Sequence, residues 1–167
     1  YADLTINALY PISSSLSNNI YSGHNYFCLR DEFRYSIKSK LNKSVSNICI
    51  LFGGVDENNI TKRVINLVVN SKLFSDCTLH VILGPGYNHE QENISISHNI
   101  KIYKNTKKIS SIMRVCDFAF TSAGRTLYEL LSLNIPPIVI AQNTRESTHT
   151  LVNDELYCKY LGVHNEV

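Results

Sequence analysis

Four short segments of this sequence carry residue types that bind anions and sugars: glycines, hydroxyls, amides and arginines. They are Gly53-Gly54-Val55-Asp56, Gly84-Pro85-Gly86, Ser122-Ala123-Gly124-Arg125 and Gln142-Asn143-Thr144-Arg145-Glu146. Each follows an apolar run of strand length, where a glycine is often only a turn residue. However, the carboxyl ends of parallel strands meet at one edge of a sheet, and open α/β proteins bind their ligands there. Four such segments therefore indicate one shared site.

The third of these segments leads directly from a predicted strand into a predicted helix. Free backbone N–H groups and the positive end of the helix then face outward together, which favours a phosphate. Gly124 has no side chain to hinder an approaching anion, and Arg125 and Thr126 open the helix. The residues alone thus predict a phosphate site at this turn.

Glu129 lies about one turn into the same helix, and two interpretations of it remain open. Its carboxylate could accept hydrogen bonds from both hydroxyls of a ribose. Alternatively, Arg125 and Glu129 stand at i and i+4 and form a surface ion pair, worth ~0.3–0.5 kcal/mol. The spacing favours neither interpretation.

The glycine pair Gly53-Gly54 also lies between a strand and a helix. It matches neither the dinucleotide fingerprint nor the P-loop, so it indicates either a close backbone approach to a ligand or only a tight turn. The five cysteines and six histidines have no metal-ligand spacing. His149 could line the site, with a capping or surface role as the alternative. We expect no cofactor, no metal and no catalytic residue in this chain.

The elements that must position these segments are apolar strands that alternate with amphipathic helices. We predict strands at 47–52, 78–83, 100–103, 117–121 and 137–141, and helices that begin near 60, 109, 125 and 148, the last ending near 160. Asn58 or Asn59 is the expected N-cap of the helix near 60, and the polar stretch 87–99 allows a short helix. Fully apolar strands joined by helices predict an α/β fold with a doubly wound parallel sheet, Rossmann-like.

The first 25 residues fit this alternation less well. Residues 3–9 have the pattern of a strand, 10–24 form a connector rich in Pro, Ser and Asn, and the apolar run 26–29 follows. We interpret residues 1–25 as the end of a preceding domain with a linker, and 26–167 as one further domain. The chain is therefore expected to be a piece of a longer protein.

The overall composition excludes some classes of protein. Of the 167 residues, 44% are apolar and 18% are charged, and 16 Lys and Arg against 14 Asp and Glu leave a net charge of +2. A strongly electrostatic nucleic-acid-binding protein would be more basic. No apolar run approaches the ~20 residues of a membrane span. The widely spaced cysteines are expected to be reduced, in the cytoplasm.

Three longer motifs occur in order along the chain and together resemble a known family. They are Ile50-Leu51-Phe52-Gly53-Gly54-Val55-Asp56, Asp117-Phe118-Ala119-Phe120-Thr121-Ser122-Ala123-Gly124-Arg125-Thr126-Leu127-Tyr128-Glu129 and Gln142-Asn143-Thr144-Arg145-Glu146-Ser147-Thr148-His149. Over about residues 3–163 the chain resembles the C-terminal half of the UDP-sugar hydrolases of nonulosonic (pseudaminic) acid synthesis and their spore-coat polysaccharide relatives (PseG/SpsG type). Residues 26–33 resemble the strand and Arg-x-Glu-Phe turn that open this half.

That family is similar to MurG-type glycosyltransferases and has the two-domain GT-B fold. The resemblance implies that residues 26–167 form a nucleotide-sugar-binding domain, whose partners are a UDP-sugar and the N-terminal domain of the same protein. That domain supplies a Gly-rich loop with a catalytic histidine, and no segment here matches this loop. Arg125 is a departure, because several relatives carry a small residue there.

The resemblance also implies roles for individual residues. Gly53 and Gly54 would approach the ligand, Ser122–Gly124 would hold the diphosphate or uracil, Glu129 would bind the ribose, and Asn143 would contact the substrate. With the loops described above, the candidate substrate-binding residues are Gly53, Gly54, Gly84, Gly86, Ser122, Ala123, Gly124, Arg125, Thr126, Glu129, Gln142 and Asn143.

The expected function is the nucleotide-sugar-binding domain of a UDP-sugar hydrolase in surface-polysaccharide biosynthesis. Two alternatives remain open. One is a GT-B glycosyltransferase that uses the same kind of donor, and the other is a non-catalytic nucleotide-sugar-binding module fused to a nucleotidyltransferase. The 167-residue chain by itself is expected to be inactive.

Overall fold

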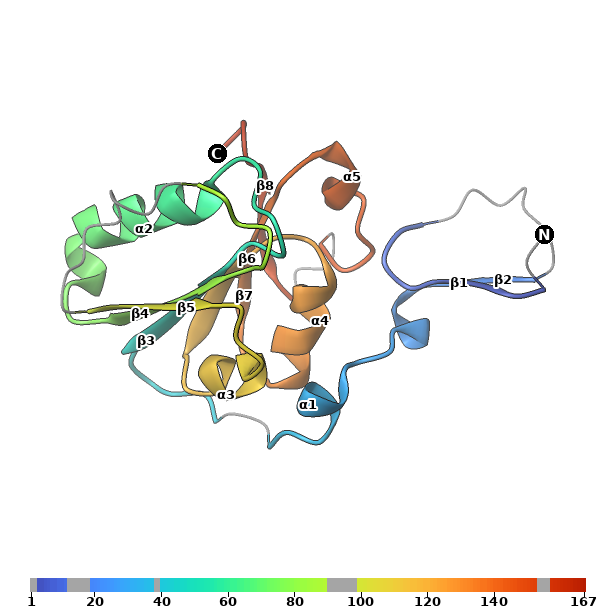
Figure 1. The fold of residues 1–167 in the computed structure, drawn as a ribbon, viewed down its shortest axis with the longest axis horizontal. Coiled ribbons are helices and arrows are strands. Elements are labelled where there is room, and N and C mark those ends of the chain that lie inside the picture. Colours follow the sequence, from blue (N-terminus) through green and yellow to red (C-terminus); the bar gives the residue numbers. More distant parts are fainter. Residues whose placement is uncertain (1–2, 12–18, 38–39, 90–98, 153–156) are drawn as a thin grey trace.

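The main feature of the molecule is a six-stranded parallel sheet with helices on both faces (Figure 1). The computed structural model of the 167-residue chain describes residues 3–11, 19–37, 40–89, 99–152 and 157–167. The strand order is β5-β4-β3-β6-β7-β8. These strands are β3 (Asn47–Leu51), β4 (Thr78–Leu83), β5 (Ile100–Lys104), β6 (Phe118–Thr121), β7 (Pro137–Ala141) and β8 (Lys159–Val163). This arrangement confirms the predicted doubly wound, Rossmann-like sheet.

Helices cover the two faces of the sheet because its strands are apolar on both sides. Helix α2 (Ile60–Asn70) packs on one face, against Ile48 and Ile50 of β3. The other face carries α3 (Ile109–Met113), α4 (Arg125–Ser132) and α1 (Asp31–Arg34), which pack around Cys49 and Leu51. Successive side chains of a strand point to opposite faces, so a continuous apolar run is what a doubly covered strand requires.

The start of α2 differs from the prediction. Asn59 precedes the helix, but its backbone is left-handed (φ 49°) and its side chain caps nothing. Instead, the buried carboxylate of Asp56 accepts hydrogen bonds from the N–H groups of Ile60 and Thr61, both at 2.9 Å. Asp56 therefore stabilises the N-terminus of α2, because the intervening residues turn tightly enough to bring it back.

The C-terminal elements also differ from the prediction. A helix was expected from 148 to 160, but α5 spans only Thr144–Ser147, and Lys159–Val163 form β8 alongside β7. Residues 153–156 of the expected helix lie outside the described residues, as do 90–98 of the stretch that allowed a short helix. Leu151 and Val152 are buried in a turn. A few apolar residues at mixed spacing fit a helix or a strand equally well, which explains the error.

The N-terminal residues form a small unit beside the main sheet. Strand β1 (Thr5–Asn7) pairs in parallel with β2 (Ile20–Ser22), and the pair stands apart from the six-stranded sheet (Figure 1). The apolar run 26–29 joins no sheet; it follows the short 3-10 helix η1 (His24–Tyr26). Leu9, Phe27 and Leu29 pack against the core near α4. Within the described residues, no helix has the length and apolar character needed to cross a membrane.

Candidate functional site

The loops that follow β3 and β4 lie against each other at the carboxyl edge of the sheet. A β-carbon on Gly84 would lie 2.5 Å from the carbonyl oxygen of Gly53. The N–H of Gly86 donates to the carbonyl oxygen of Gly54 at 2.8 Å. Gly84 is therefore required by the contact between the two loops, whereas a β-carbon on Gly54 would meet no atom within 4 Å.

Ser122, directly after β6, lies where three of the predicted segments meet. A β-carbon on Gly53 would lie 3.8 Å from Ser122 Oγ and 3.7 Å from Gln142 Nε2, and one on Gly124 would lie 3.9 Å from Ser122 Oγ. Ser122 is only 3% exposed, and none of the described residues forms a hydrogen bond with its hydroxyl. The buried side-chain atoms without a hydrogen-bond partner include Oγ1 of the neighbouring Thr121 but not Ser122 Oγ, so the Ser122 hydroxyl keeps some accessible surface and can be reached by a ligand.

Residues Ser122, Ala123 and Gly124 form the loop between β6 and α4, here called the serine loop. Helix α4 begins directly after this loop and has no side-chain cap. Gly124 is its N-cap residue, and no side chain accepts a hydrogen bond from the first turn. The N–H groups of Arg125 and Thr126 are among those that a helix N-terminus leaves without an intrahelical acceptor. The serine loop thus offers a hydroxyl and backbone donors on one surface.

One donor of the predicted phosphate turn is already occupied. The carboxylate of Glu146, in α5, accepts hydrogen bonds from the N–H of Ala123 at 3.3 Å and from the N–H of Gln142 at 2.8 Å. Burial raises the pKa of the Glu146 carboxyl. This carboxylate joins the loop after β6 to the loop after β7, a contact that could not be predicted from the residue types and their spacing.

The loop after β7 uses its amides mainly to hold the edge together. Gln142 Nε2 donates to the carbonyl oxygen of Phe52 at 3.0 Å, and Asn58 Nδ2 donates to the carbonyl oxygen of Gln142 at 3.1 Å. Asn143 caps α5, since its Oδ1 accepts from the N–H of Glu146 at 3.0 Å. Gln142 and Asn143 therefore have defined structural partners in addition to any ligand.

Glu129 is buried within α4, at 5% exposure. Its Oε1 accepts a hydrogen bond from Arg30 Nε at 2.8 Å. The alternative surface pair with Arg125 is not formed, because the Arg125 guanidinium lies over the ring of Phe27 instead. The partner of Glu129 is thus a residue 99 positions away in the sequence.

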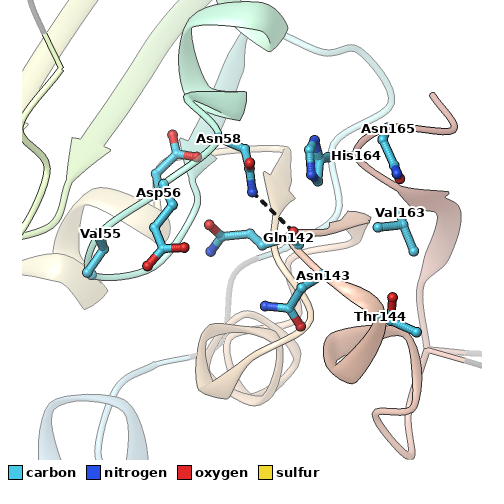
Figure 2. Close-up of a pocket in the computed structure, with 11 residues that line it drawn as sticks. Val55, Asp56, Asn58, Gln142, Asn143, Thr144, Val163, His164 and Asn165 are labelled. Atoms are coloured by element: carbon cyan, nitrogen blue, oxygen red, sulfur yellow. Dashed lines mark hydrogen bonds between the residues drawn. The ribbon is translucent and has the colours of Figure 1, made fainter.

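A polar cavity of about 530 Å³ lies at the same edge of the sheet, beside these loops (Figure 2). Its lining comes from the loops after β3 and β7 and from the end of β8: Gly54, Val55, Asp56, Glu57, Asn58, Gln142, Asn143, Thr144, Val163, His164 and Asn165. Of the predicted site residues, Gly54, Gln142 and Asn143 line it. Ser122, Glu129 and the other predicted residues do not.

Sequence reasoning missed the wall of the cavity that β8 provides. His164 and Asn165 directly follow this strand (Figure 2). Its first two residues were predicted to end a helix, and no element was predicted for residues 161–165. Arg63 of α2 fixes that wall, because its guanidinium donates to the carbonyl oxygen of His164 at 2.7 Å. A strand predicted at 159–163 from its alternating residues would have placed His164 and Asn165 at the carboxyl edge of the sheet.

His149 is a core residue and does not line the polar cavity. It is fully buried, its Nδ1 accepts from the N–H of Leu151 at 3.2 Å, and its ring packs against Tyr10 and Tyr128. Burial lowers its pKa from 6.5 to about 4. The site-lining and surface roles predicted for it are therefore wrong. In the described part of the chain, no group of three or more His, Cys, Asp or Glu residues is placed to hold a metal ion.

Comparisons with known proteins find a similarity in sequence to a spore coat polysaccharide biosynthesis protein and a similarity in fold to a glycosyltransferase. No protein-family model matches it. It is 35% identical over 164 residues to an uncharacterized protein of Methanocaldococcus jannaschii, covering 86% of this chain and 33% of that protein. It is 24% identical over 151 residues to the spore coat polysaccharide biosynthesis protein SpsG of Bacillus subtilis, covering 85% of this chain and 44% of that protein.

A solved structure supports the fold. The crystal structure of the glycosyltransferase SnogD from Streptomyces nogalater is similar with a TM-score of 0.51 and 17% identity, covering 82% of this chain and 36% of that one. The chain thus spans less than half the length of each of these three proteins. It has a Rossmann-like fold similar to that of a GT-B glycosyltransferase, and its sequence is related to that of a polysaccharide biosynthesis protein.

Proposed function

We propose that this chain binds a nucleotide sugar, in the form of a UDP-sugar, at the carboxyl edge of its sheet. The observation that carries the proposal is the Ser122 hydroxyl, nearly buried between Gly53 and Gly124 and without a partner among the described residues. The similarity to SpsG and to a glycosyltransferase supports the choice of a nucleotide sugar over other phosphorylated ligands.

The diphosphate is assigned to the start of α4. Ser122 Oγ and the free N–H groups of Arg125 and Thr126 would donate to its oxygens, and Gly53 and Gly124 would leave room for it. The positive end of α4 adds to the attraction. Donors fixed in this way also stabilise the negative charge that develops on a diphosphate leaving group.

The ribose is assigned to Glu129. Because Arg30 Nε binds Oε1, the carboxylate is held in one orientation, and Oε2 would accept from the ribose hydroxyls. A charge-assisted hydrogen bond is worth ~1.5–3 kcal/mol, so even one such bond contributes substantially to affinity. Arg30 is thereby a positioning residue for this contact.

The sugar is assigned to the polar cavity. Its lining contains amides from Asn58, Gln142, Asn143 and Asn165, and no Lys or Arg. Amides donate and accept hydrogen bonds without net charge, which suits sugar hydroxyls. Asp56 and Glu57 at the same cavity would repel a diphosphate, so the two parts of the ligand are expected to lie in different parts of the site.

In the whole protein, the proposed reaction breaks the bond between the anomeric carbon of the sugar and the diphosphate. Water attacks the anomeric carbon, a general base takes a proton from that water, and UDP leaves. We assign the base to a preceding domain, as the family resemblance implies. The similarity to a glycosyltransferase favours a second candidate, in which a sugar acceptor replaces water.

Two measurements test the proposal. Ser122→Ala should weaken UDP binding by ~5- to 10-fold, the loss of about 1 kcal/mol or slightly more, with unchanged thermal stability because the hydroxyl has no partner to lose. Unchanged UDP affinity in this variant would contradict the assigned diphosphate position. For the whole protein, free sugar released from a UDP-sugar without acceptor indicates the hydrolase, and product formed only with acceptor indicates the transferase.

A further inference from the structure

Two arginines flank the serine loop without an acidic partner. Arg125 is the first residue of α4. Arg145 lies in α5, next to Glu146, whose carboxylate accepts from the N–H of Ala123. The ion pairs found among the described residues join Arg30 to two glutamates and involve neither Arg125 nor Arg145. Arg125 therefore stands at the start of α4, Arg145 stands next to the residue that contacts Ala123, and neither guanidinium forms an ion pair among the described residues.

Each of these arginines lies over an aromatic ring of the N-terminal segment. The guanidinium carbon of Arg125 is 5.8 Å from the ring centre of Phe27, and that of Arg145 is 4.7 Å from the ring centre of Tyr10. Such cation–π contacts are attractive even at exposed sites. They restrict an otherwise mobile side chain and leave the N–H edge of the guanidinium free to donate.

The two rings are themselves fixed to the main domain. Phe27 stacks on Tyr128 of α4 at 4.0 Å between ring centres and 9° between planes. Tyr10 packs edge-on against the buried ring of His149 at 5.9 Å. The backbone beside Tyr10 is also held, since the N–H of Thr150 donates to the carbonyl oxygen of Leu9 at 3.0 Å. Each ring is thus a rigid support for the arginine above it.

We propose that Arg125 and Arg145 form a two-arginine clamp for the diphosphate of the ligand, and that Phe27 and Tyr10 are the positioning residues of this clamp. The inference rests on the proposed function and deepens it. The Glu146 carboxylate lies on the serine loop and would repel a diphosphate. The clamp explains how a diphosphate could still bind there. Two guanidinium groups offset that charge, and each can donate two parallel hydrogen bonds to phosphate oxygens.

Titration calorimetry of the 167-residue protein with UDP and with uridine tests the clamp. Arg125→Ala and Arg145→Ala should each weaken UDP binding by ~5- to 20-fold, about 1–2 kcal/mol, and leave uridine binding within twofold. Phe27→Leu and Tyr10→Leu should weaken UDP binding by ~2- to 5-fold. The matched control is Tyr35→Leu, because Arg34 lies over Tyr35 at 5.7 Å in a contact of the same kind outside the site.

A double variant separates positioning from a purely structural role. If Phe27 acts through Arg125, then Phe27→Leu combined with Arg125→Ala binds UDP as Arg125→Ala does alone, because the two losses are not additive. Arg125→Lys, which keeps the charge but loses the planar fork, should fall between wild type and Arg125→Ala. Arg125→Lys leaves Phe27 unchanged, so it still tests the clamp if Phe27→Leu fails to fold.

The outcomes distinguish the clamp from the proposed function. If wild type binds UDP and both arginine variants retain its affinity within twofold, the clamp is wrong and the nucleotide-sugar site stands. If the arginine variants lose uridine binding as strongly as UDP binding, the arginines do not act on the diphosphate and the clamp is again wrong. If wild type binds neither UDP nor uridine, the proposed function itself fails.

Discussion

Glu129 has an observed structural role in the fold and, in the proposed site, a role in binding the ribose. Its position in α4 was evident from the sequence, and the structure pairs its buried carboxylate with Arg30. That pairing could not be predicted, because the two residues are 99 positions apart and only the packing of α1 on α4 brings them together. Asp56 makes the same point: its role as the cap of α2 depends on a tight turn that the residue types alone do not specify.

Glu129→Gln tests this double role. The amide keeps the shape but loses the charge, so UDP binding should weaken by ~10-fold or more, about 1.4 kcal/mol. The ion pair with Arg30 is lost as well, and since the Arg30 side chain is 44% exposed, we expect the free energy of unfolding to fall by only about 1 kcal/mol.

Arg30→Gln is the matched control for Glu129→Gln. It should lower stability at least as much, because it leaves the buried Glu129 carboxylate without its cation, while UDP binding weakens less, because Glu129 keeps its charge. Chemical denaturation and calorimetry measure the two effects separately. Equal UDP affinity in wild type and Glu129→Gln would remove Glu129 from the site.

His149 predicts how stability depends on pH. The folded protein holds the imidazole neutral until about pH 4, whereas an unfolded chain takes up the proton near pH 6.5. Between these values the unfolded state binds more protons, so stability falls as the pH is lowered from 6.5 to 4, by about 3 kcal/mol from this group. Tyr10 and Tyr128 pack against the ring, and neither supplies a negative charge there in this range.

His149→Asn checks the assignment of this pH dependence. The amide can still accept from the N–H of Leu151 but cannot take up a proton. Urea unfolding at a series of pH values should show a flatter profile between pH 6.5 and 4 in the variant. A profile as steep as that of wild type would show that another group is responsible.

At the scale of elements, the sequence predicted best where burial is complete. The runs that became β3, β4 and β7 are apolar throughout, and α2 has a regular apolar stripe, so periodicity identified them. It failed for β8, whose exposed and half-buried residues alternate with no continuous apolar run. Because β8 was not predicted, His164 and Asn165 were not expected to line the cavity.

The contact between the loops after β3 and β4 can be tested by substituting its glycines. Gly84→Ala places a β-carbon against the carbonyl oxygens of Gly53 and Gly54, so one loop must shift. We expect a loss of about 2 kcal/mol or more in the free energy of unfolding, within the range of overpacked sites, together with weaker UDP binding.

Gly54→Ala is the control for this pair of loops. Its β-carbon would meet nothing within 4 Å, and its φ is not in the left-handed region. Stability should therefore stay within about 0.5 kcal/mol of wild type. If the ligand approaches the backbone at Gly54, UDP affinity should still fall. A stability loss in Gly54→Ala as large as that in Gly84→Ala would contradict the loop contact described here.

At the scale of the whole molecule, one sheet edge gathers the serine loop, the buried carboxylate of Glu146 and the polar cavity. The N-terminal segment packs beside this edge through Phe27 and Tyr10. The chain corresponds to less than half the length of each of the three similar proteins reported above. We therefore expect the 167-residue protein to bind its ligand without turning it over. Release of UDP from UDP-N-acetylglucosamine by the purified chain, above the rate in buffer, would contradict this expectation.

The central claim, that this edge of the sheet binds a UDP-sugar, is tested most directly by comparing ligands on the wild-type chain. Calorimetric titration with UDP, UDP-N-acetylglucosamine, ADP and NAD measures the four affinities under one set of conditions. The account predicts that both uridine nucleotides bind at least ~10-fold more tightly than ADP or NAD, a difference of about 1.4 kcal/mol, because the dinucleotide fingerprint is absent. Tighter binding of NAD than of UDP, or no binding of either uridine nucleotide, would contradict it.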